Sequence, residues 1–166
     1  MTSWLSIDLL RSKAQALARA LEVGAIAIDD VVAWADAVIE RENHPHWSIC
    51  ELSLCRRRPP SEVVSLLGDV PGTVFPQLAE AALAQVLLDS LDNDSSRADR
   101  IARALYDLAL DCQIDDPDLL SLAWWAWDAL DLADSGVATE TRPEVVAKMR
   151  ETLVATLERA HCCAPG

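Results

Sequence analysis

The chain of 166 residues is long enough to bury a proper core, and we expect a single domain over residues 1–166. Lys and Arg total 14 against 27 Asp and Glu, which gives a net charge of −13. This charge repels nucleic-acid phosphates and anionic lipid and attracts basic proteins, so we expect no nucleic-acid and no membrane partner.

Cysteine usage and the start of the chain predict the compartment. The five cysteines have no framework spacing, which is typical of reduced thiols in a cytoplasm. The first residues, "MTSWLSIDLLRSK", place Asp8 where a secretory signal needs an apolar run. We therefore expect a soluble cytoplasmic protein, and the usage of Ala, Arg and Asp suggests a GC-rich bacterial genome.

Apolar residues recur at helical spacing along nearly the whole chain, and no segment alternates as a strand does. We predict an all-α fold of about seven to eight helices, arranged as a helical bundle or a short α-solenoid. The expected helices are 7–23, 29–42, 47–55, 62–70, 75–91, 97–111, 117–134 and 142–160. The expected N-caps are Asp29, Ser61, Asp115 or Asp116, and Thr141 leads the last helix.

Three short matches suggest an internal duplication. "ARAL" occurs at 18–21 and 102–105, "IDD" at 28–30 and 114–116, and "EVV" at 62–64 and 144–146. The matches keep their order at an almost constant offset, which is a feature of helical repeats. They predict two related halves, 1–91 and 92–166, whose stacked helix pairs would present a surface to a partner.

The segment "HPHWSICELSLC" resembles a zinc site only superficially. Cys50 and Cys55 lie about 140° apart on a helix and do not easily share one ion. We expect Cys50 to be a small core residue and His44 and His46 to lie in a loop. Free thiols are expected in the terminal "HCCAPG", and no cofactor is expected.

The stretch "IDDPDLLSLAWWAWDALDLAD" (114–134) carries the strongest functional signal. On a helical wheel centred on Ser121, Trp124 falls inside the polar stripe with Asp128 and Asp131, and Trp125 falls on its edge. Trp127 falls nearer the apolar side, where we expect core packing. The residues expected to be buried are Leu120, Ala123, Ala126, Leu130 and Ala133.

The same region is rich in acidic residues. No Lys or Arg occurs from Ala104 through Thr141, an interval with nine carboxylates. An exposed tryptophan pair beside unpaired carboxylates is typical of an interface for a basic protein. The predicted partner-binding residues are Asp115, Asp116, Trp124, Trp125, Asp128 and Asp131.

Two other interpretations stay open. Asp115, Asp116 and Asp128 are the residues that would hold magnesium if the chain were a helical hydrolase. A homo-oligomer whose tryptophans pair with each other is the third interpretation. We favour binding over catalysis, because the sequence offers no nucleophilic triad, phosphate loop or dinucleotide fingerprint.

The stretches "IDDVVAWADAVIE" and "DDPDLLSLAWWAWDALDLAD", in a small acidic helical chain, resemble bacterial immunity proteins. Such proteins neutralise a basic toxin by covering its active site. The resemblance implies an immunity or antitoxin-type module that occludes a basic partner and is not an enzyme. It rests on overall character, with no family motif matched residue by residue.

Overall fold

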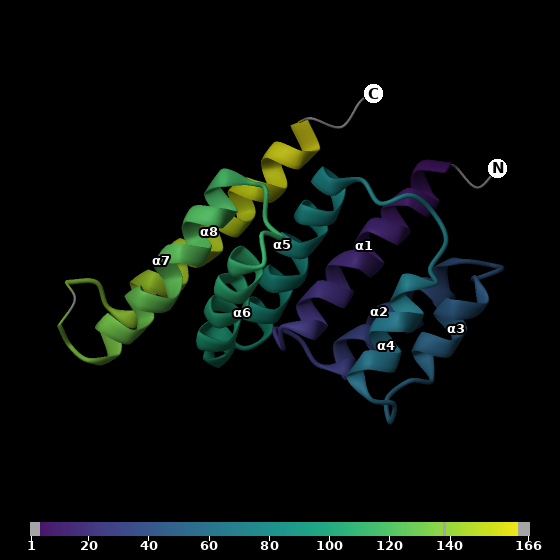
Figure 1. Ribbon diagram of the computed structural model, residues 1–166, viewed down its shortest axis with the longest axis horizontal. Helices are drawn as coiled ribbons and strands as arrows, with labels where there is room; N and C mark the ends of the chain where they lie inside the picture. The colour runs from purple at the N-terminus through teal and green to yellow at the C-terminus, as the bar shows by residue number, and fades with distance from the viewer. Residues whose placement is uncertain (1–3, 138, 163–166) are drawn as a thin grey trace. The chain divides into compact units, whose positions relative to one another are not determined.

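Helices account for all the regular secondary structure in the part of the chain that the computed structural model describes, residues 4–137 and 139–162 (Figure 1). Side chains are described for 7–137 and 139–159, so the prediction about the Cys162 and Cys163 thiols lies outside them. The elements are α1 (Trp4–Glu22), α2 (Ile28–Arg41), α3 (Trp47–Ser53), α4 (Pro60–Gly68), α5 (Pro76–Asn93), the 3-10 helix η1 (Ser95–Arg97), α6 (Ala98–Leu110), α7 (Pro117–Asp134) and α8 (Arg142–Cys162). The described residues contain eight α-helices and no strand, which confirms the all-α prediction.

The helix starts follow capping chemistry, and two predicted caps are wrong. Asp116 caps α7, as expected, because its Oδ1 accepts hydrogen bonds from the Leu119 and Asp118 N–H groups at 2.9 and 3.0 Å. Asp29 and Ser61 instead lie inside the first turns of α2 and α4. At α2 the Asp30 carboxylate accepts from the Ala27 N–H at 2.8 Å, and at α4 a proline occupies the first helical position.

Backbone contacts divide the chain into two compact units, Met1–Ala79 and Glu80–Gly166, with α5 running across the boundary. This division falls twelve residues before the predicted border between halves 1–91 and 92–166. In the first unit α1 packs on α4 and α2 on α3; in the second α6 packs on α7 and α7 on α8. The copies of "ARAL" and "EVV" thus fall on helices with different neighbours, and the second "IDD", at 114–116, precedes α7 in a loop. The duplication and the single domain remain predictions.

The first unit corrects the prediction for Cys50. Short α3 buries the face that carries Ile49 and Leu52, and Cys50 lies on the opposite, exposed face beside the exposed Trp47. Cys55, which follows the helix, is the buried thiol, and this burial raises its pKa. His44 and His46 lie in the loop before α3, as expected, and His46 caps the helix through its Nδ1.

The second unit contains the stretch of greatest interest. α7 contacts α6 and α8. A loop joins α7 to α8, and the two helices lie side by side (Figure 1). Its inward residues are Leu119, Leu122, Ala123, Ala126, Ala129 and Leu130. The start of α7 is also tied to α5, because the buried Glu80 carboxylate accepts hydrogen bonds from the Asp115 and Asp116 N–H groups. Within the described residues, every helix falls short of the length or the apolar character that a membrane span requires.

Two leucines of α7 provide a test of this packing. Leu130 is 1% exposed and Leu132 is 45% exposed. Leu130→Ala leaves a cavity between helices, so we expect the free energy of unfolding to fall by about 2–5 kcal/mol. Leu132→Ala removes exposed surface and should change it by less than about 0.5 kcal/mol. Urea unfolding followed by circular dichroism measures both, and equal losses would contradict the orientation of α7.

Candidate functional site

The outer surface of α7 carries an exposed tryptophan at the edge of a groove. Trp124 is 44% exposed, as the helical wheel predicts, and Trp125 is half-buried. A groove of about 560 Å³ lies between them and the α7–α8 loop. Its lining is formed by Ser121, Trp124, Trp125, Asp128, Ala129, Leu132 and Glu140. We call this the Trp124 groove.

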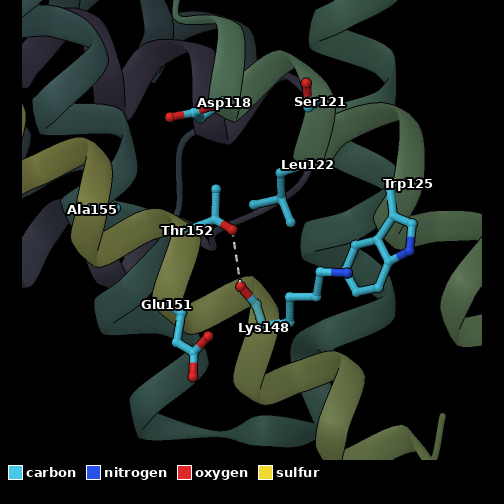
Figure 2. Close-up of a pocket in the computed structure, with 8 residues that line it drawn as sticks. All are labelled: Asp118, Ser121, Leu122, Trp125, Lys148, Glu151, Thr152 and Ala155. Atoms are coloured by element: carbon cyan, nitrogen blue, oxygen red, sulfur yellow. Dashed lines mark hydrogen bonds between the residues drawn. The ribbon is translucent and has the colours of Figure 1, made fainter.

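Trp125 also borders a second groove, of about 460 Å³, between α7 and α8. Figure 2 shows Lys148 of α8 extending to the indole of Trp125, with its Nζ 4.2 Å from the ring centroid. The same Nζ lies 4.0 Å from Glu140 Oε1. A cation over an indole face is attracted by the electrons of the ring, so this contact holds Lys148 against Trp125.

Trp127 is half-buried, and its predicted core position is therefore wrong. The guanidinium of Arg103 from α6 lies over its ring at 5.4 Å from the centroid. The buried arc of α7 is also turned from the predicted one, since Leu120 and Ala133 are only half-buried while Leu119, Leu122 and Ala129 are buried. The buried arc is the one that faces α6 and α8 together, and its direction depends on where these two helices lie. Trp124 itself makes an edge-to-face contact with Tyr106, with ring centroids 5.4 Å apart.

The first turn of α7 is an ionic structural site. Arg159 of α8 binds Asp116 at 3.0 Å and Asp118 at 2.7 Å. Burial alone would raise the pKa of Asp116, but the hydrogen bond from the Leu119 N–H and the bond and charge of Arg159 outweigh it, so the pKa is lowered. Asp116 is thus engaged in capping and in holding α8.

The expectation that the carboxylates of 104–141 lack basic neighbours is wrong for most of them. Five of the nine have an ionic partner from outside the interval: Asp107 with Arg103, Asp116 and Asp118 with Arg159, Asp134 with Arg142, and Glu140 with Lys148. The other four are exposed and have no ionic partner among the side chains that the structure describes: Asp111, Asp115, Asp128 and Asp131. Counting charge along a sequence interval misses partners that a neighbouring helix supplies.

The structure brings together three of the six predicted site residues: Trp124, Trp125 and Asp128 line one groove. Asp131 is exposed one turn further along α7 and does not line it. Asp115 and Asp116 lie at the other end of the helix, and twelve residues separate Asp116 from Asp128, about 18 Å at about 1.5 Å per residue.

This separation bears on the magnesium interpretation. One ion cannot be bound by carboxylates at opposite ends of a straight helix segment, since its oxygen ligands must lie within about 2.1 Å of it. In the part of the chain that the structure describes, no three His, Cys, Asp or Glu side chains gather where they could hold a metal ion. The geometry therefore offers no support for Asp115, Asp116 and Asp128 as a shared set of ligands.

Lys148, Glu140 and Leu132 were missed by sequence reasoning. A signal for Lys148 was present in the spacing of residues on either side of the loop that joins α7 to α8. Asp134 with Arg142, Trp125 with Lys148, and Asp118 with Arg159 are pairs whose members lie at nearly equal chain distances from that loop. This mirrored spacing is what an antiparallel helical hairpin produces, and it would have identified the cation on Trp125.

No family model, curated protein or solved structure matches this chain. The case for a function therefore rests on the geometry and charge of the α7 surface.

The lowered pKa of Asp116 gives a pH-dependent prediction. Asp116→Asn keeps a capping side chain but loses the charge that binds Arg159, so above pH 5 we expect a loss of about 0.5–1 kcal/mol, reduced by solvent screening. A lowered folded-state pKa contributes stability above the ordinary value of 3.8, which is lost as the pH falls through the folded value. The difference between wild type and variant should therefore close as the pH falls below about 4.

Urea unfolding across this pH range measures the difference. Asp131→Asn is the matched control, because Asp131 is exposed and has no ionic partner among the described side chains. A difference for Asp116→Asn that stays constant down to acid pH would contradict the ionic role of Asp116.

Proposed function

We propose that this protein is a binding module that docks a basic protein against the outer surface of α7. The observation that carries the proposal is the Trp124 groove, where an exposed indole lies beside Asp128, a carboxylate without an ionic partner among the described side chains. Aromatic surface of this kind supplies contact energy, and the carboxylate selects the sign of the partner.

Magnitudes support a tryptophan-centred contact. Tryptophan is enriched at binding hot spots, where truncation to alanine costs ~2 kcal/mol or more. Leu132, 45% exposed, extends the apolar part of the groove. Exposed ion pairs at the rim are worth less than about 1 kcal/mol each, so the carboxylates contribute mainly through attraction at a distance and through selectivity.

The charge of the chain favours a basic partner. The net charge is −13, and residues 84–166 contain 16 acidic and seven basic residues. The negative field of the chain attracts a basic partner and accelerates their association. Salt screens this attraction over roughly 8 Å at physiological ionic strength. Within this proposal, the finer assignment is an immunity or antitoxin-type protein that acts in the cytoplasm of a bacterium, occludes a basic toxin, and needs no cofactor and no catalysis.

Quantitative capture from a native lysate, read by mass spectrometry, tests the docking surface. We expect a basic protein captured by wild type to be lost with Trp124→Ala, Asp128→Lys. The matched control is Trp47→Ala, since Trp47 is also exposed but lies on α3 of the other compact unit. Capture that survives the α7 variant, or is lost equally with the control, would contradict docking through α7.

Association kinetics of the captured protein, once purified, test the electrostatic part. We expect its association rate constant to fall at least tenfold between about 50 mM and about 500 mM salt, with a smaller change in dissociation. Surface plasmon resonance measures both rates. A salt-independent association rate would contradict the electrostatic part of the proposal. Sizing of the free protein shows whether it self-associates, and loss of self-association in Trp124→Ala would place the second copy at this tryptophan.

A further inference from the structure

The free protein already contains a cation bound to an indole and a carboxylate. Lys148 Nζ lies 4.2 Å from the centroid of Trp125 and 4.0 Å from Glu140, and the side chains of Lys148 and Glu140 are half-exposed. The backbone carbonyl of Lys148 accepts a hydrogen bond from the Thr152 hydroxyl at 3.0 Å, and Figure 2 marks this bond with a dashed line. The ammonium group of Lys148 thus occupies the cation position over Trp125, one indole of the adjacent pair.

The neighbouring indole, Trp124, meets Tyr106 edge to face and has a carboxylate nearby, but no cation from the described side chains lies over its ring. Trp124 borders the groove of about 560 Å³ together with Asp128, one helical turn further along α7, and Glu140 closes the groove from the α7–α8 loop. Asp128 has no ionic partner in the described part of the chain, and no Lys or Arg lines this groove. The ring, the carboxylate and the open volume repeat the site at Trp125, with the cation position open to a ligand.

We propose that the Trp124 groove takes an arginine side chain of the partner, stacked on Trp124 and paired with Asp128. This assignment rests on the proposed docking function and names the chemistry that the groove recognises. Arginine fits better than lysine because its planar guanidinium stacks on an aromatic ring, binds a carboxylate through two N–H groups, and is more weakly hydrated than an ammonium group.

Lys148 competes in this scheme, because Glu140 borders the groove and also pairs with Lys148. An incoming guanidinium meets the positive charge of Lys148 and shares Glu140 with it. Replacing Lys148 by methionine keeps an apolar chain against Trp125 and removes the charge. Arginine binding should then become tighter, by about two- to five-fold, the factor that corresponds to one exposed charge interaction.

The probe is a short peptide, acetylated and amidated tri-arginine, titrated into the full chain labelled with ¹⁵N. The indole N–H signal of Trp124, assigned with Trp124→Phe, is expected to shift and saturate. Tri-citrulline, which has the same shape without the charge, should leave it unmoved, and tri-lysine should bind more weakly. Asp128→Asn should weaken the binding of tri-arginine about two- to five-fold. Asp131→Asn, on the same helix but outside the groove, should leave the affinity for tri-arginine unchanged.

The assignment is overturned if tri-arginine leaves the Trp124 signal in place, if tri-lysine binds as tightly, or if Asp128→Asn and Asp131→Asn weaken binding equally. An affinity that Lys148→Met leaves unchanged overturns the competition. These failures are distinct from failure of the docking function. If lysate capture depends on Trp124 but tri-arginine does not bind, the docking function stands and the arginine assignment is wrong. If tri-arginine binds but no capture depends on Trp124, the arginine site stands and the docking function is wrong.

Discussion

The packing of α7 against both α6 and α8 is the constraint on which the candidate site depends. Six residues of α7 are buried, within an arc of about 120° on a helical wheel at about 100° per residue. Three of the six are alanines, which allow a helix backbone to approach its neighbours closely. With this arc facing inward, Trp124 and Asp128 can only face outward. The exposure of Trp124 therefore follows from helix packing and involves no local distortion of the backbone.

Ion pairs fix the same hairpin at both ends and leave its middle open. Arg159 joins the start of α7 to α8, and Arg142 joins its end to α8 and also to Asp99 of α6. These arginines neutralise Asp116 and Asp134, so the carboxylates at the two ends serve the fold. Asp128 and Asp131, in between, keep their charge for solvent or for a partner. The groove that contains Asp128 is therefore a better candidate for partner binding than the acidic stretch as a whole.

Sequence periodicity was sufficient for the helices and for the outward position of Trp124, because both depend on spacing within one segment. The Asp116 cap was also predictable, since an aspartate before Pro117 is a local signal. The exposure of Cys50 was not predictable, because it depends on which face of short α3 meets its neighbours. Lys148 on Trp125 lay beyond the prediction for a related reason: its partner is 23 residues away, and only the hairpin brings the two together.

The two adjacent tryptophans support the proposal that the groove binds a cation and not a purely apolar ligand. An apolar ligand would gain from Trp124 and Leu132 but would desolvate Asp128 without replacing its hydrogen bonds, which is unfavourable. A guanidinium covers the indole with its flat face and supplies N–H donors to the carboxylate at its edge. The ammonium of Lys148 on Trp125, next to Glu140, follows the same rule within the chain. In the proposed docking, charge and aromatic surface would act as one recognition element. A partner without a basic side chain at this position would keep the apolar contact with Trp124 and lose the pairing with Asp128.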